Sequence, residues 1–201
     1  MGGPGSERSV SLASGAGVST ALRSLGAEVF EIDVQGPDFN LPSAVDIVFN
    51  VIHGTFGEDG QLQRILDARE VRYTGEGVRG SELAIDKIAT KRRLLEHGVP
   101  TALFEVLRGA ELPTLPLPFV LKAPREGSSV GVYIVREASE VEARLRDVRG
   151  YAQEILVEEY VSGRELTVGI LGKTALSVVE ICPKQGFYDF KNKYPFLNPQ
   201  A

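Results

Sequence analysis

The sequence predicts an α/β protein, in which a parallel-sheet domain at the N-terminus is followed by an α+β unit. Up to about residue 97, short β-branched runs alternate with runs of helical periodicity, which is typical of a layered fold of sheet and helices. After Gly98 and Pro100, short apolar runs are separated by tight turn signals around a single helical stretch. This change of pattern favours a separate α+β unit.

The first elements follow from the spacing of apolar residues. Leu12, Val18 and Leu22 recur at helical spacing and predict an amphipathic helix over 8–25. The β-branched runs 27–34 and 46–54 are expected to be neighbouring parallel strands. A helix, a brief strand and a longer helix should follow at 59–70, 71–73 and 80–97. We also expect a strand before the glycines at 2–3, but only Met1 precedes them.

The second part should contain short strands around one helix. The strands are expected at 101–108, 118–123, 130–135 and 154–163, and the helix at 138–148. The segment 165–182 predicts a hairpin that turns at Gly172 and Lys173. Its sequence TVGILGKT approaches a phosphate-binding loop, but Thr167 replaces the first glycine and strands flank it, so the hairpin is favoured. The final residues, 188–201, are expected to be a loop.

Composition excludes several classes of function. The chain has 201 residues and a net charge of −5, without a basic face for nucleic acid. No apolar run approaches the roughly 20 residues that span a bilayer, so no membrane insertion is expected. Cys182, the one cysteine, excludes an intrachain disulfide, lies in an apolar stretch where burial is expected, and indicates a cytoplasmic location. No metal-binding cluster is predicted from the sequence.

A strand, a glycine-serine turn and a second strand form the strongest local signal, VLKAPREGSSVGVYIV. The glycines allow backbone N–H groups to approach an anion, Ser128 and Ser129 add hydroxyl donors, and Lys122 adds a positive charge. The pattern therefore predicts a phosphate cradle. A plain flexible hairpin loop is the alternative.

Other candidates are weaker on their own. Glu158 and Glu159 end an apolar strand beside Tyr160 and Val161, which suits either a purine pocket or a solvated edge. Lys87 lies on a helical segment, where a lysine is most often solvated. The other candidate, His53, ends an apolar run, where α/β folds place ligand-contacting groups, although a lone histidine is more often a structural hydrogen-bonding residue.

Six segments occur in order: MGGPGSERSVSL, VIHGTFGEDGQLQ, YTGEGVRGSELAIDK, LKAPREGSSVGV, LVEEYVSGRELTV and FYDFKNKY. Their order and spacing resemble those of D-alanine:D-alanine ligases of the ATP-grasp superfamily, over essentially the whole chain. The resemblance implies a Rossmann-like pre-ATP-grasp domain followed by an ATP-grasp domain that is incomplete at its C-terminus. The expected divisions are a substrate-binding domain at 1–86, a central subdomain at 87–162, and the start of a C-terminal subdomain with a mobile loop at 163–201.

In that family ATP phosphorylates one D-alanine, and the amine of a second attacks the acyl phosphate. The resemblance implies that Lys87 and Lys122 hold the ATP phosphates, with Ser129 near the γ-phosphate. The adenine and ribose positions are Glu158, Glu159, Tyr160, Val161 and Glu165. Glu159 replaces a residue that is often lysine in the family, but this contact is expected to be made by the backbone.

The resemblance also assigns the amino-acid side of the site. Glu7 matches the carboxylate that binds the ammonium of the first D-alanine, with His53 close by. Ser128 and Tyr194 match the partners of that glutamate in a hydrogen-bonded triad. Lys193 matches a mobile-loop lysine that reaches the γ-phosphate as the loop closes.

Two departures from the family pattern limit what the resemblance implies. The first strand and a C-terminal segment with an oxyanion arginine and Mg²⁺ ligands are expected to be missing, so the 201 residues alone should be inactive or nearly so. A D-alanine:D-lactate ligase and a non-catalytic nucleotide-binding fragment are the alternatives, and Lys193 and Tyr194 favour an amine acceptor over lactate. The family also implies a homodimer.

Overall fold

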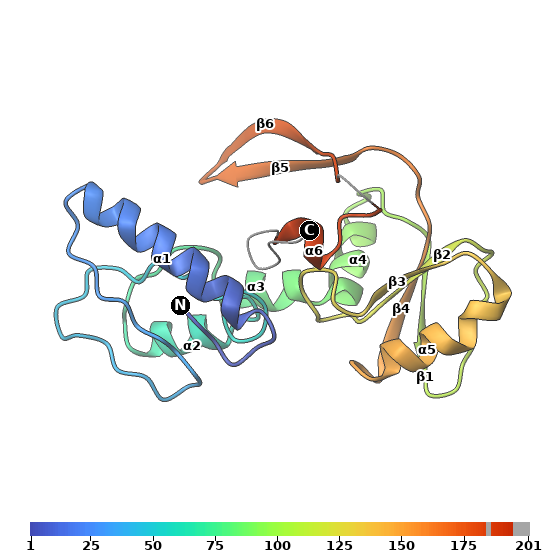
Figure 1. Cartoon of the computed structure of the whole chain (residues 1–201), viewed down its shortest axis with the longest axis horizontal. Coiled ribbons are helices and arrows are strands. Elements are labelled where there is room, and N and C mark those ends of the chain that lie inside the picture. The colour runs from blue at the N-terminus through green and yellow to red at the C-terminus, as the bar shows by residue number, and fades with distance from the viewer. Residues whose placement is uncertain (184–185, 195–201) are drawn as a thin grey trace. The chain divides into compact units, whose positions relative to one another are not determined.

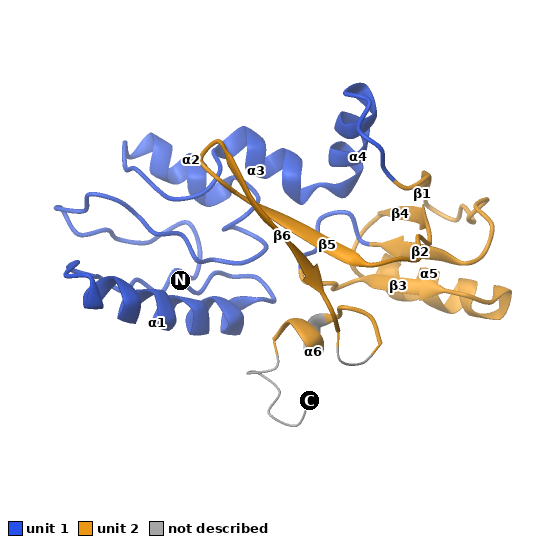
Figure 2. Ribbon diagram, turned by 90° about the horizontal axis from the view of Figure 1, so that it is seen from above, with its two compact units in different colours: residues 1–101, 123–127 blue, residues 102–122, 128–201 orange. Residues whose placement is uncertain are grey.

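The computed structural model describes residues 1–183 and 186–194, which form two compact units. Unit 1 comprises residues 1–101 and 123–127, and unit 2 comprises 102–122 and the described residues from 128 onward (Figure 2). Figure 1 shows the elements in chain order. The segment 123–127 is therefore part of unit 1, although both of its neighbours in the chain are part of unit 2. The three-part division at residues 86 and 162 stays a prediction.

The helices of unit 1 agree with the sequence except at one point. They are α1 (Arg8–Ser24), α2 (Gln61–Ala68), α3 (Val78–Ile85) and α4 (Lys87–Glu96). The helices expected at 8–25 and 59–70 are thus confirmed. The single helix expected at 80–97 is two helices, because the backbone of Asp86 is extended and its side chain caps α4 by accepting hydrogen bonds from the N–H groups of Ile88 and Ala89.

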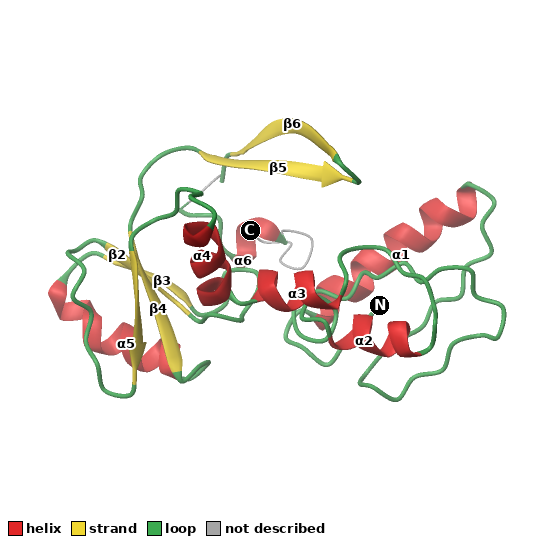
Figure 3. Cartoon of the chain, turned by 180° about the vertical axis from the view of Figure 1, so that it is seen from behind, coloured by secondary structure: helices red, strands yellow, loops and turns green. Residues whose placement is uncertain are grey.

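The strands expected in unit 1 are not formed. Two isolated parallel bridges, Gly2 to Val34 and Val48 to Tyr73, stand in their place, and Figure 3 shows the runs around them as loops. A strand needs a neighbour that is hydrogen-bonded along its length. In the run 27–34, main-chain hydrogen bonds to Met1 and Gly3 are made only near its C-terminal end, at Ile32 and Val34, among the described residues. The predicted pairing of the runs 27–34 and 46–54 with each other is not found among the described residues, because their parallel bridges are made to Gly2 and Tyr73 instead.

Unit 2 is built on a four-stranded antiparallel sheet with the order β1-β4-β2-β3. Its strands are β1 (Phe104–Arg108), β2 (Phe119–Lys122), β3 (Val132–Val135) and β4 (Glu154–Glu159). The 3₁₀ turn η1 (Ala138–Glu140) leads into α5 (Val141–Arg149), which contacts β2, β3 and β4. The expected strands and helix of this part are confirmed.

The two faces of this sheet differ in what they carry. Arg144 of α5 lies 5.4 Å from the ring centre of Tyr133, so α5 covers the face to which Tyr133 points. Leu121 pairs with both Tyr133 and Val157 and is fully buried on that face. Because side chains alternate along a strand, Lys122 points to the opposite face.

The last described strands form a separate two-stranded ribbon. β5 (Glu165–Leu171) and β6 (Thr174–Ile181) pair antiparallel across the turn at Gly172 and Lys173, which confirms the predicted hairpin. Both strands are exposed along nearly their whole length, and Cys182, which follows β6, is exposed too. The predicted burial of this cysteine was wrong, because no described residue covers it.

A four-residue helix, α6 (Phe190–Lys193), lies in the segment expected to be a loop, and residues 195–201 of that expectation lie outside the described residues. Among the helices in the described part of the chain, none has the length and apolar character needed to cross a bilayer.

Candidate active site

The carboxylate of Glu7 is held in a tight glycine-lined position of unit 1. The residue is only 4% exposed and directly precedes α1. Its Oε2 atom lies so close to Gly54 and Gly127 that a Cβ on either would clash; at Gly127 the distance would be 2.6 Å. Glycine is needed at both positions for this approach. A buried carboxylate so placed suits a cationic ligand.

His53 and Glu58 lie around the same position. The Nε2 atom of His53 is 3.1 Å from Ser14 Oγ, and its Nδ1 atom is 3.8 Å from Glu58 Oε1. Glu58 also accepts a 3.0 Å hydrogen bond from the N–H of Gly54. Partial burial raises the pKa of Glu58, and the nearby charge of Glu7 adds to the rise, although the Glu58 side chain is still 49% exposed. Two neighbouring carboxylates favour a positively charged group.

Lys87 does not lie on a solvated helix face. Its backbone N–H donates to the carbonyl of Pro124 at 3.0 Å, and its Nζ donates to the carbonyls of Glu126 at 2.5 Å and Pro124 at 3.4 Å. The first residue of α4 is therefore attached to the segment that precedes the glycine-serine turn. Phosphate binding by Lys87 stays a prediction.

The glycine-serine turn has an unusual backbone and two connections within unit 2. Ser128 and Ser129 have φ angles of 49° and 63°, in the left-handed region that non-glycine residues seldom adopt. The hydroxyls of Ser128 and Tyr194 are 2.7 Å apart, and Ser129 Oγ donates to the carbonyl of Tyr188 at 3.0 Å. The turn is thus joined to the segment 186–194, about sixty residues further along the chain.

Lys193 belongs to that same segment. Its Nζ lies 5.2 Å from the ring centre of Tyr188, and its backbone N–H donates to Asp189. The side chain of Asp189 accepts hydrogen bonds from Asn192, which stabilises the short helix α6. Lys193 and Tyr194 are therefore carried by one locally hydrogen-bonded segment.

Lys122 and Glu158 form an ion pair on the sheet face opposite α5. Glu158 is the cross-strand partner of Val120, so it is a diagonal neighbour of Lys122. The two side chains are 26% and 12% exposed. An anionic ligand would have to draw the lysine away from this carboxylate, and the pair keeps both charges satisfied until then.

Unit 2 also has a cavity of about 500 Å³, and neither Lys122 nor Glu158 is among the residues that line it. It is lined by Val132, Tyr133, Ile134, Arg136, Arg144, Tyr160, Gly186 and Phe187. Val132 is the direct cross-strand partner of Lys122, and the guanidinium of Arg136 lies 4.9 Å from the ring centre of Tyr160. Mixed aliphatic, aromatic and cationic walls suit a planar ligand that carries negative charge.

The other residues predicted to contact adenine or ribose are either hydrogen-bonded to the neighbouring main chain or exposed. The N–H groups of Glu159 and Tyr160 donate to the carbonyls of Leu103 and Pro118, so a base would have to pair with other main-chain groups here. The Glu159 carboxylate accepts from the N–H of Leu103. Val161 is 67% exposed and Glu165 begins the exposed strand β5.

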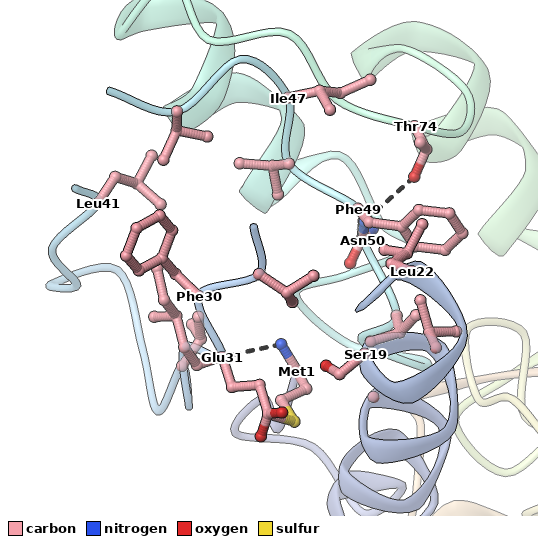
Figure 4. A pocket seen from close by; sticks show the side chains of 18 of the residues that line it. Met1, Ser19, Leu22, Phe30, Glu31, Leu41, Ile47, Phe49, Asn50 and Thr74 are labelled. Carbon is pink, nitrogen blue, oxygen red and sulfur yellow. Dashed lines mark hydrogen bonds between the residues drawn. The ribbon is translucent and has the colours of Figure 1, made fainter. Parts of the chain in front are cut away.

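A second cavity, of about 420 Å³, lies in unit 1 and is largely apolar (Figure 4). Residues of α1 and of the runs 27–34 and 44–52 are among those that line it. Phe30, Ile47 and Phe49 line it and are each about half exposed. None of the predicted site residues lines this cavity.

Within residues 1–183 and 186–194, no group of three or more histidine, cysteine, aspartate or glutamate side chains has the arrangement of a metal site.

Comparison with known families identifies the chain. The family model described as "D-ala D-ala ligase C-terminus" matches residues 96–201, and the model "D-ala D-ala ligase N-terminus" matches residues 35–76. The chain belongs to the D-alanine–D-alanine ligase family. Enzymes named D-alanine–D-alanine ligase from Methylacidiphilum infernorum and Granulibacter bethesdensis are 44% and 45% identical to it. These alignments cover 96% of this chain but only 64% and 65% of the two relatives.

Solved structures agree with this family assignment. The structure of D-alanine–D-alanine ligase from Bacillus anthracis matches with a TM-score of 0.81 at 28% identity, over 96% of this chain and 66% of that one. D-alanyl-alanine synthetase A from Vibrio cholerae matches in fold, with a TM-score of 0.76 at 24% identity, over 92% and 67%. The predicted α/β fold of the ATP-grasp type is therefore confirmed.

Several residues of this ligase-family chain were not singled out in the sequence. Ser14 and Glu58 contact His53, and Arg136 contacts Tyr160, but nothing in the sequence pattern marks these three. Asp86 had a recognisable signal, because an aspartate directly before a helical run is a common N-cap. Arg125, which pairs with Asp86, lies inside the predicted phosphate loop.

Proposed function

We propose that this chain forms the substrate-facing part of an ATP-dependent ligase that joins two D-alanines into D-alanyl-D-alanine, for peptidoglycan precursor synthesis. The observation that carries the proposal is the 2.7 Å hydrogen bond between the hydroxyls of Ser128 and Tyr194. It supports a serine-linked tyrosine that can orient or deprotonate an amine. The buried carboxylate of Glu7 lies against Gly127, the residue before Ser128, which supports its membership of the same triad.

The proposed reaction has two steps. A carboxylate oxygen of the first D-alanine takes the γ-phosphoryl group of ATP, which yields an acyl phosphate and ADP. The amine nitrogen of the second D-alanine then attacks the carbonyl carbon and loses a proton, and the tetrahedral intermediate expels inorganic phosphate as the peptide bond forms. Glu7, with His53 nearby, binds the ammonium of the first D-alanine, while Ser128 and Tyr194 position the attacking amine.

ATP is proposed to bind mainly to unit 2. Its base enters the 500 Å³ cavity beside Tyr160, while Glu158, Glu159, Val161 and Glu165 contact the adenine and ribose. Lys122 leaves its ion pair for the phosphates, helped by Lys87 and Lys193, and Ser129 lies near the γ-phosphate. ATP-grasp ligases also use Mg²⁺, which neutralises phosphate charge, but the described residues supply no cluster of ligands for it.

The nature of the acceptor and the assembly are also proposals. Lys193 and Tyr194 favour an amine acceptor, and the D-lactate alternative predicts ester formation when both acceptors are offered together. A cytoplasmic location is supported by the single cysteine. A homodimer through the N-terminal region is proposed from the family, and a monomer mass by light scattering would contradict it.

Calorimetric titration of the 201-residue chain with ATP tests the nucleotide site. Lys122→Met should weaken ATP binding by about tenfold, since it removes a charge-assisted contact with phosphate. Lys173→Met, in the exposed hairpin turn, removes the same charge elsewhere and should leave binding unchanged. Equal affinities of wild type and Lys122→Met would contradict the assigned site, and a wild type that binds no ATP would contradict the proposed function.

A further inference from the structure

We propose that Asp86 and Arg125 are positioning residues, whose ion pair holds the segment 123–127 so that the following Ser128–Ser129 turn has one conformation for phosphate. Nothing in the reaction requires either side chain to touch substrate. The link to phosphate rests on the proposed function, whereas the holding of the segment does not.

The carboxylate of Asp86 is held in place by the backbone of α4 and pairs with Arg125 from that fixed position. Its Oδ1 atom accepts hydrogen bonds of 3.0 Å from the N–H groups of both Ile88 and Ala89, which fixes the carboxylate at the start of α4. Its Oδ2 atom accepts from Nε and Nη2 of Arg125 at 3.1 and 3.0 Å. Most surface ion pairs contribute little because both side chains must be ordered. Here the aspartate is already ordered and only 17% exposed, so the pair restrains mainly the arginine and its segment.

The same segment has two further attachments to the start of α4. Lys87 donates through its backbone N–H and its Nζ to the carbonyls of Pro124 and Glu126. Ala123 is fully buried. The segment is therefore held at nearly every residue from 123 to 126.

The turn that follows needs this restraint. Ser128 and Ser129 both have left-handed backbone conformations, which cost free energy in residues other than glycine and persist only where the surroundings determine them. The hydrogen bonds of the two serines to Tyr194 and Tyr188 fix the turn from segment 186–194. On the N-terminal side, the segment held by Arg125 fixes it.

The restraint on segment 123–127 also affects Glu7, because this segment ends at Gly127. Oε2 of Glu7 lies against this glycine, at a distance that leaves no room for a Cβ atom. A segment that moved by a fraction of an ångström would change this contact as well as the turn. The ion pair therefore bears on the contact between Glu7 and Gly127 within unit 1.

Amide hydrogen exchange of the full chain tests the proposal directly. Arg125→Gln and Asp86→Asn should each speed exchange at residues 125–131 by about tenfold, because the restrained state is lost. Asparagine still caps α4, so Asp86→Asn removes the ion pair without unfolding the helix. The double variant should exchange no faster than either single variant, because both remove one interaction.

The matched control is Arg108→Gln. Arg108 pairs with Glu154 at the edge of the sheet and is 66% exposed, so its replacement should leave exchange at 125–131 unchanged. Unchanged exchange in both Arg125→Gln and Asp86→Asn would overturn the proposal, as would an equal effect of Arg108→Gln.

ATP titration of the same variants separates the two ideas. If the wild type binds ATP, both single variants should lose about five- to tenfold in affinity, and Arg125→Lys should recover part of the loss. Faster exchange with unchanged affinity would overturn the link to phosphate. If the wild type binds no ATP, the proposed function fails, and the exchange rates alone decide whether the ion pair holds the segment.

Discussion

The fold holds individual residues of this chain in states that they do not favour by themselves, either in backbone conformation or in ionisation. Ser128 and Ser129 have positive φ angles, and Glu58 keeps a carboxyl whose pKa is raised by partial burial and by Glu7. Such features cluster at functional sites because the surrounding structure determines them. The sequence indicated the serines through the glycines around them, but Glu58 had no signal, because its partners Gly54 and Glu7 meet it only in the folded chain.

We predict that the free energy of unfolding of Ser129→Gly is about 1 kcal/mol higher than that of Ser129→Ala, because glycine adopts a left-handed conformation without steric cost. Both variants lose the hydroxyl that donates to Tyr188, so the comparison isolates the backbone. Urea unfolding followed by circular dichroism measures the difference. Equal stabilities would show that the φ angle of 63° carries no strain.

At the scale of elements, local signals were reliable for helices and for antiparallel strands. The hairpin β5–β6 and the helix α1 follow from turn residues and apolar spacing, which act within a few residues. The break at Asp86 was missed because helical periodicity continues across it, and the N-cap interaction outweighed that periodicity. The runs 27–34 and 46–54 have strand composition, but a strand also needs a partner along its whole length.

Two replacements of Asp86 should separate the contribution of its N-cap to stability from the contribution of its charge. Asp86→Ala should cost about 1 kcal/mol at pH 7 through loss of the N-cap, and Asp86→Asn should cost less. Burial opposes ionisation of Asp86, but hydrogen bonds from Ala89 and Arg125 outweigh it and lower the pKa of Asp86 in the folded state.

The sign of the pH dependence follows from that direction. A carboxyl with a lowered folded pKa contributes stability above its unfolded pKa of about 3.9 and loses it as pH falls through the folded value. The stability difference between wild type and Asp86→Asn should thus be present at pH 7 and shrink below about pH 4. Urea unfolding at a series of pH values checks this, and a difference that grows on acidification would contradict it.

The whole molecule consists of two units with separate cores. Leu66 is fully buried in the core of unit 1, together with Val34, Ile52, Phe56 and Leu62. Leu121 is fully buried in unit 2, between β3 and β4. Separate compact units of one chain can open separately, which makes each unit a candidate folding unit.

We expect Leu121→Ala to lower the stability of unit 2 by about 2–5 kcal/mol through the cavity that it creates, with faster amide exchange in β2 and β4. Leu66→Ala should do the same in α2 and leave β2 and β4 unchanged. Leu171→Ala, at a site 72% exposed, is the control and should change neither. Exchange that rises equally in both units after either core substitution would show that the chain unfolds as one unit.

The sequence by itself determined the family, the order of the elements in unit 2, the hairpin and the residue types of the glycine-serine turn, because all of these depend on patterns that extend over a few to a few tens of residues. Only the tertiary structure decided which of these residues meet. It placed Tyr194 on Ser128, Glu7 against Gly127, and Arg125 on Asp86. Contacts between residues that are far apart in the chain depend on how the elements pack, and no local pattern records that packing.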